Sequence, residues 1–170
     1  VLCAPLIAPA NGTLAVESSA LKTRLLTMLD TPTSTALTLA VVGVAVRMLH
    51  ANGGAAVVAP LAEAWIPALL TRDGPAITHA LFELAFHCQQ APAVLGQHTV
   101  ALLQRARIDV SAADVPTRLA GLKLLGVLLS SGISSLQSIG EGDEPVALLR
   151  MLHKLAQGDE SDKVRALAQA

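Results

Sequence analysis

Aromatic side chains are nearly missing from this chain of 170 residues, which has one tryptophan, two phenylalanines and no tyrosine. Proteins that bind single-stranded nucleic acids stack the bases on such side chains, so this class of function lacks its usual platform. Charged residues are also few, with 12 basic and 13 acidic side chains, and their net charge is only −1. A positively charged surface that would attract nucleic acid or an anionic membrane is therefore not expected.

The chain also has few cysteines and no long uncharged stretch. The two cysteines, Cys3 and Cys88, form no Cys-x-x-Cys pair and no disulfide framework, which favours a reducing compartment and a cytoplasmic protein. The longest uncharged runs, 31–46 and 48–62, are each shorter than the ~20 residues that a membrane-spanning helix needs, so membrane insertion is not expected. The apolar start of the chain lacks a basic region and carries Pro5 and Pro9, so no targeting signal is expected.

The sequence is instead rich in apolar residues, at 52%, and it repeats one type of turn. Asp-x-Pro occurs as Asp30-Thr31-Pro32, Asp73-Gly74-Pro75 and Asp114-Val115-Pro116, at steps of 43 and 41 residues. A fourth acidic turn, at Asp159, follows Asp114 by 45 residues. A further copy, Asp143-Glu144-Pro145, starts a helix outside this rhythm, so the tripeptide also marks helix starts in general. A period of about 40–47 residues is typical of two-helix repeats that stack into a solenoid.

Apolar residues at helical spacing between these turns predict helix pairs after an irregular segment, 1–16. The trailing helices 33–51 and 115–131 are apolar on nearly all sides, so we expect further layers of the chain or a partner to cover them. In the leading helix 55–71, Pro60 and Pro67 are expected to kink or split the helix, because each removes one backbone hydrogen bond. A loop is expected over 107–114 and a connector over 132–142. The four pairs are expected at 17–51, 55–90, 93–131 and 143–170.

The last pair has the clearest amphipathic pattern. The apolar stripe of its first helix is made of Leu148, Leu149, Leu152, Leu155 and Ala156. The polar residues Arg150, Lys154 and Gln157 lie outside this stripe. The chain starts with Val1 instead of methionine, and residues 162–170 read as the opening of a helix. Both features predict a piece of a longer protein.

The paired helices, the step of 41–45 residues and the acidic or proline turns resemble the HEAT and armadillo repeat superfamily. The closing segment Asp162-Lys163-Val164-Arg165-Ala166-Leu167-Ala168 resembles it best, because a Val-Arg pair after an acidic residue commonly opens the second helix of a HEAT repeat. In the other units the corresponding positions are interpreted as lacking this arginine. The resemblance covers about residues 17–170 and implies an all-α fold, a right-handed α-solenoid of about four antiparallel helix pairs.

The resemblance implies a non-catalytic scaffold that binds another protein, with no cofactor and no small-molecule substrate. An alternative is a tubulin-binding HEAT array, a class that uses the turns inside each helix pair. Arg72, Arg105 and Arg107 are predicted near such turns, where they form either a solvated edge or polar contacts to a partner. The candidate partner contacts are these turn arginines and residues of the third trailing helix: Arg72, Arg105, Arg107, Arg118, Leu124 and Leu128.

His79, Glu83 and His87 form the strongest candidate for a chemical site. Their spacing of four residues places them on one helix face, where nitrogen and oxygen atoms could bind a metal ion. A helical metal-binding enzyme is therefore the alternative from another class of function. One helix supplies only part of a coordination shell, and the spacing differs from the His-Glu-x-x-His pattern of metalloproteases. The preferred interpretation is that these residues form the polar face of an otherwise apolar helix, with no metal.

Overall fold

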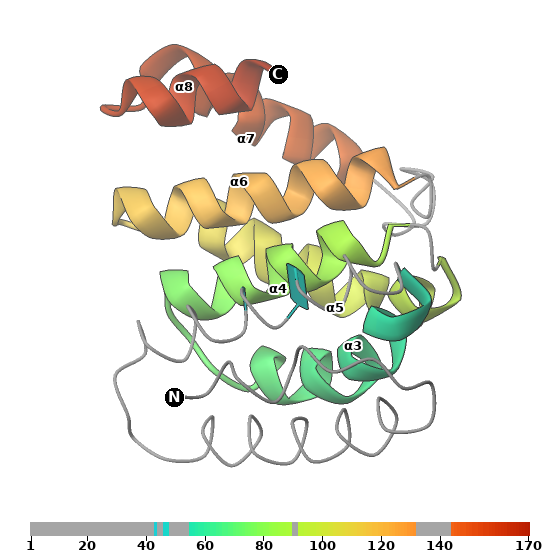
Figure 1. Cartoon of the computed structure of the whole chain (residues 1–170). Coiled ribbons are helices and arrows are strands. Elements are labelled where there is room, and N and C mark those ends of the chain that lie inside the picture. The colour runs from blue at the N-terminus through green and yellow to red at the C-terminus, as the bar shows by residue number, and fades with distance from the viewer. Residues whose placement is uncertain (1–42, 44–45, 48–54, 90–91, 132–143) are drawn as a thin grey trace, which may run out of the picture. The chain divides into compact units, whose positions relative to one another are not determined.

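The structure is a computed structural model that describes residues 43, 46–47, 55–89, 92–131 and 144–170, all within one unit of the chain, Leu39–Ala170. These residues form helices and turns without a strand, which confirms the all-α prediction for them (Figure 1). The predictions for 1–16, for the turn at Asp30, for most of 17–51 and for 132–142 lie outside the described residues. The helices with described bounds are α3 (Ala55–Leu70), α4 (Pro75–His87), α5 (Pro92–Val110), α6 (Val115–Ser130), α7 (Glu144–Gly158) and α8 (Asp162–Gln169).

Two of the Asp-x-Pro turns start helices α4 and α6 through local chemistry. Before α6, the carboxylate of Asp114 accepts hydrogen bonds from the amide of Thr117 at 2.8 Å and from its hydroxyl at 2.7 Å. The first of these bonds satisfies an amide that has no partner within the helix. Proline then lies in the first turn of both helices, where its missing N–H costs nothing. Before α4, Gly74 has a φ of 115°, which glycine adopts without the strain that a side chain would cause.

Pro60 and Pro67 were expected to kink or split helix α3, but they do not split it. The helix continues through both Pro60 and Pro67. Both proline rings are exposed, and so is Glu63, which lies four residues before Pro67. Water can therefore bind the carbonyl group that Pro67 leaves without a donor, which makes an interior proline tolerable on this side of the helix.

The loop predicted at 107–114 is also wrong in its first half. Helix α5 continues to Val110, so that only residues 111–114 connect it to α6. The polar residues near the end of α5 suggested a loop, but Arg105 and Asp109 form an ion pair one helical turn apart. Both charges are thereby compensated within the helix, and the helix can extend into the interior of the fold.

Most helices that follow each other in the sequence pack together, and several also pack on helices further along the chain. Contacts within pairs join α3 to α4, α5 to α6 and α7 to α8, and contacts between pairs join α3 to α5, α4 to α6 and α6 to α8 (Figure 1). Among the helices that the structure describes, none has the length and apolar character needed to cross a bilayer. The largest fully buried side chains are Trp65, Ile66, Leu69, Leu81, Leu84, Leu95, Leu102, Leu124, Leu125, Leu128 and Leu148.

The nearly apolar helix α6 is covered by the chain itself. It contacts α4, α5 and α8, and both Leu124 and Leu128 are fully buried. A second apolar cluster, centred on Val110, Leu122 and Val164, joins α5, α6 and α8, and residues of α7 pack against it. At these positions further layers of the chain, and not a partner, bury the apolar surface. A polar residue at Leu124 or Leu128 would therefore disturb the core instead of testing a binding surface.

Helices α5 and α6 approach each other closely at Gly121. A Cβ atom on this residue would lie 2.8 Å from the backbone nitrogen of Val110 and 2.9 Å from Cβ of Asp109. Neither atom can move without shifting the backbone of α5, so the glycine is what lets the two helices meet at this distance. Gly126, further along α6, has open space where its Cβ would be.

Candidate functional site

The buried side chain of Arg105 connects α5 to α4 and to the turn between α3 and α4. Its Nε donates to Oδ2 of Asp109 at 2.7 Å. Its Nη1 donates to the carbonyl oxygen of Arg72 and, at 3.1 Å, to the carboxylate of Asp73, both in that turn. Its Nη2 lies 3.4 Å from the hydroxyl of Thr78, which in turn donates to Asp109. One guanidinium group therefore holds two helices and a turn together.

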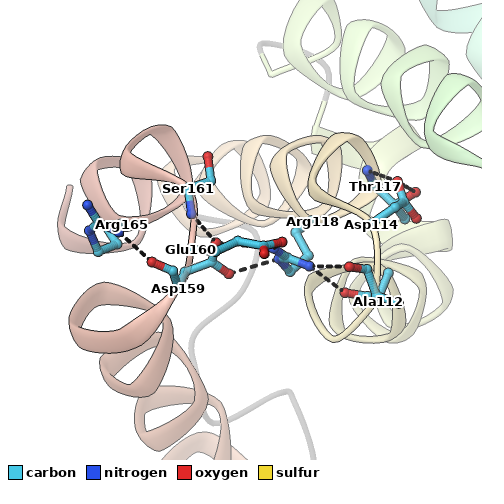
Figure 2. A network of polar contacts seen from close by, with 9 residues as sticks. Ala112, Asp114, Thr117, Arg118, Asp159, Glu160, Ser161 and Arg165 are labelled. Atoms are coloured by element: carbon cyan, nitrogen blue, oxygen red, sulfur yellow. Dashed lines mark hydrogen bonds and ion pairs between the residues drawn. The ribbon is translucent and has the colours of Figure 1, made fainter.

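Arg118 of α6 forms the second such centre, which Figure 2 shows. Its Nη1 donates to the carbonyl oxygens of Ala112 and Ala113 in the α5–α6 turn, at 3.0 and 2.6 Å. Its Nη2 donates to Asp159 at 3.1 Å and to Glu160 at 3.0 Å, both in the α7–α8 turn. Its Nε lies 2.8 Å from the second carboxylate oxygen of Asp159. Arg118 thus joins two turns that are more than 40 residues apart in the sequence.

Arg165 of α8 repeats part of this arrangement. Its guanidinium donates to the carbonyl oxygen of Asp159, six residues earlier (Figure 2). It also pairs with Asp162. Arg118 likewise donates to the carbonyl oxygen of Ala112, six residues earlier. Arg118 and Arg165 therefore make the same kind of contact, each with the carbonyl oxygen six residues earlier. The sequence analysis missed this likeness, because a threonine stands before Arg118 where a valine stands before Arg165.

After the turn between α3 and α4, the residue six positions beyond Arg72 is Thr78. The side chain of Thr78 is too short to reach that far back. Its hydroxyl lies 3.3 Å from the carbonyl oxygen of Gly74, only four residues earlier, and it also bonds to Asp109. The carbonyl oxygen of Arg72 accepts its hydrogen bond from Arg105 of the following helix instead. Three successive turns therefore have a carbonyl group bound by a guanidinium, which comes from α5, α6 and α8 in that order.

The contacts of Arg118 also shift pKa values at the α7–α8 turn. Burial by itself would raise the pKa of Asp159, but the amide of Ser161, which donates to it at 2.9 Å, and the guanidinium of Arg118 together lower this pKa. In return, the hydrogen bond to Asp159, followed by that to Glu160, raises the pKa of Arg118. Both groups are therefore charged at neutral pH, and their attraction stabilises the joined turns.

The Asp159→Asn variant is expected to lose less stability in acid than the unmodified chain does. A carboxyl group whose pKa falls below 3.8 on folding contributes stability above that pH and loses it as the pH falls through the lower folded value. The variant does not titrate at this position, so its unfolding free energy should fall less steeply below about pH 4. Urea unfolding at a series of pH values measures both slopes. Asp162→Asn, at an exposed site, is the control, and equal slopes for Asp159→Asn and the unmodified chain would contradict the expectation.

The arginines predicted to contact a partner are divided between the interior and the surface. Arg105 and Arg118 are only 7% and 8% exposed, so the predicted solvated edge is wrong for Arg105. The two predicted leucines lie in the core, as described above. Arg72 and Arg107 are half-buried and interact with other groups of the chain. A contact between any of these residues and a partner stays a prediction.

The row of His79, Glu83 and His87 on α4 is not arranged around one point. Glu83 places Oε1 at 3.6 Å from Nε2 of His79 and Oε2 at 3.6 Å from Nε2 of His87. Each imidazole thus faces a different carboxylate oxygen, and no three His, Cys, Asp or Glu side chains of the described residues are placed to hold a metal ion. Burial lowers the pKa of His79, while Glu83 opposes this effect. The geometry fits a row of polar side chains along an apolar helix.

Cys88, which follows this row, is buried at the end of α4. Burial raises the pKa of its thiol to about 11. The thiol is therefore protonated at neutral pH, whereas a cysteine nucleophile reacts as the thiolate. Cys88 therefore acts as a small apolar residue in the packing at the end of α4.

Several helices expose large apolar side chains that the sequence analysis missed. The large apolar side chains that are exposed in the described residues are Phe86, Val100, Ile108, Val146 and Leu149. Leu149 had been assigned to the apolar stripe of α7, but it is 57% exposed because it lies about 100° around the helix from the buried Leu148. A helical wheel centred on Leu148 would have shown that Leu149 lies off the buried side of the helix. The exposed side chains of this helix include Val146, Leu149, Arg150, His153 and Lys154, which we call the outer face of α7.

The chemistry of the described centres is that of ion pairs and hydrogen bonds to backbone carbonyl groups. Such contacts fix the geometry of the turns and do not by themselves carry out a reaction. Comparison of the chain with protein-family models, with curated proteins and with solved structures finds no match. The functional assignment therefore follows from the geometry of this chain.

Proposed function

We propose that this chain is a non-catalytic scaffold for protein–protein interaction, built as a right-handed α-solenoid of helix pairs. The observation that supports this most directly is a recurring contact at the α3–α4, α5–α6 and α7–α8 turns, where a guanidinium group binds the carbonyl oxygen of Arg72, Ala112 or Asp159. Stacked copies of one structural unit would produce such a recurrence, because each copy repeats a turn of the same kind between its two helices.

The packing supports a mechanism of rigid display. Contacts of α3 with α5, of α4 with α6 and of α6 with α8 connect each helix pair to the next. The buried guanidinium groups add polar contacts with defined directions at the turns, which oppose sliding of one pair along another. A scaffold of this kind binds by presenting a fixed surface on which many small contacts add up. Binding to tubulin and a cytoplasmic location stay predictions from the sequence.

Photo-crosslinking at exposed positions tests the scaffold role. A photoreactive amino acid is introduced into the full chain at one position at a time: Ile108 of α5, Leu149 of α7, Phe86 of α4 or Lys123 of α6. After irradiation in an extract of the source cells, we expect one protein to be captured from both leading-helix positions or from both trailing-helix positions. The same substitution at the buried Trp65 is the control. Capture of no protein from any exposed position, or equal capture from all four, would exclude a defined binding surface.

A further inference from the structure

The described side chains on the outer face of α7 carry charge of one sign. On α7, the exposed side chains from Val146 to Gln157 include Arg150, His153 and Lys154 but no carboxylate. Neither Arg150 nor Lys154 forms an ion pair with any described residue. The exposed carboxylates of the described residues lie elsewhere, at Glu63, Asp73, Asp114, Glu160 and Asp162. The outer face of α7 is therefore a basic strip.

Apolar side chains are part of the same strip. Val146 is 43% exposed and Leu149 is 57% exposed, and their spacing of three residues makes them neighbours on the helix surface. Single exposed apolar residues are common, but here two lie beside two cationic side chains on one helix. The combination offers hydrophobic contact and charge attraction to the same occupant.

A hollow of about 520 Å³ lies beside this strip, between the end of α5 and the second half of α7. Val110, Met151 and Leu155 contribute apolar surface to it, and Lys154 of the outer face also lines it. The hydroxyl of Ser111 lies 3.3 Å from the sulfur of Met151, so the α5–α6 turn and α7 touch at this point. The hollow is of the size that binding sites for small groups have, roughly 300–1,000 Å³.

We propose that the outer face of α7 and the adjacent hollow dock an acidic amphipathic segment of another protein. An apolar side chain of the segment enters the hollow, and its carboxylates pair with Arg150 and Lys154. This inference rests on the proposed scaffold role and specifies the surface and the class of partner. Nucleic acid fits less well, because its affinity comes mainly from many phosphate contacts, whereas this strip offers only Arg150 and Lys154 beside the apolar side chains of Val146 and Leu149.

Binding of designed peptides to the full chain tests the docking site. The probes are three fluorescent helical peptides with one pattern of leucines, which differ in having glutamate, lysine or glutamine at the other positions. Fluorescence anisotropy should show the glutamate peptide binding roughly tenfold more tightly than the lysine peptide, with a smaller difference at high salt. Lys154→Glu and Arg150→Glu should each weaken binding of the glutamate peptide, and Leu149→Ser should weaken binding of all three peptides. Lys123→Glu on α6, which makes the same charge change at an exposed site, should have no effect.

Several results would overturn the proposal. These are equal affinity for the three peptides, or equal effects of Lys154→Glu and Lys123→Glu in variants whose circular dichroism is unchanged. Binding to phosphatidylserine vesicles that Lys154→Glu abolishes, without preference among the peptides, would assign the strip to a membrane surface. A dimer that Leu149→Ser dissociates in sedimentation would assign it to a second copy of the chain. Photo-crosslinks at Phe86 and Lys123 but not at Leu149 would reject this site while leaving the scaffold role intact.

Discussion

Replacing Arg105 by alanine is expected to lower the free energy of unfolding by about 3–5 kcal/mol, since one partner of a buried ion pair is removed while the other remains. The carboxylate that remains is Asp109, which is buried and would keep only the hydroxyl of Thr78 as a described side-chain donor. The carbonyl oxygen of Arg72 would also lose its bond to the guanidinium. Urea unfolding, followed by circular dichroism and by the fluorescence of the buried Trp65, measures the loss.

A second variant separates the buried charge from the lost packing. Combining Arg105→Ala with Asp109→Asn removes the uncompensated carboxylate, so the double variant should be more stable than Arg105→Ala alone. Gln104→Ala, at an exposed neighbouring position in α5, should change stability by less than about 0.5 kcal/mol. A double variant as unstable as the sum of its two single changes would show that the ion pair does not account for the loss.

Gly121→Ala is expected to destabilise the fold by about 1–3 kcal/mol, the usual cost of forcing extra volume into a packed site. The new methyl group would meet the backbone nitrogen of Val110 at 2.8 Å and the carbonyl carbon of Asp109 at 3.0 Å. Backbone atoms of a buried helix cannot rotate away as the end of a side chain can, so α5 and α6 would have to separate. Thermal and urea unfolding report the effect.

Gly126→Ala is the matched control, because it makes the same change in the same helix at a position with open space. Alanine favours the helix over glycine, so this variant should gain about 0.5–1 kcal/mol of stability. The two variants thus differ in the sign of their effect, although a propensity scale predicts the same gain for both. A gain for Gly121→Ala would mean that α5 and α6 do not meet as closely as described.

The sequence predicted the parts of the fold that depend on local chemistry. The starts of α4 and α6 followed from Asp73-Gly74-Pro75 and Asp114-Val115-Pro116, because a capping carboxylate or a glycine and a first-turn proline act within a few residues. The end of α5 was misplaced because its last turn depends on the ion pair of Arg105 with Asp109 and on contacts with α4. Without knowledge of these contacts, the charged residues near the end of α5 indicated a loop.

The candidate site depends on contacts between distant residues, and most of it was not predicted. Arg118 was predicted as a contact to a partner protein, but the groups it binds within the chain, Asp159 and Glu160, lie 41 and 42 residues further along the sequence. Similarly, the sequence left open whether the chain or a partner covers Leu128, because the answer depends on how α4 and α8 pack around α6. The basic residues of α7 were placed outside its stripe correctly, whereas the exposure of Leu149 required knowing which side of the helix is buried.

The arginine that binds a carbonyl group of a turn need not occupy the same position relative to each turn. The turn before α4 is bound by Arg105 of the following helix, whereas the next turn is bound by Arg118 of its own second helix. An arginine can therefore be lost from one helix during evolution if an arginine of a neighbouring helix reaches the same carbonyl oxygen. Helix pairs that exchange this role can then differ in sequence although a carbonyl group of each turn stays bound to a guanidinium.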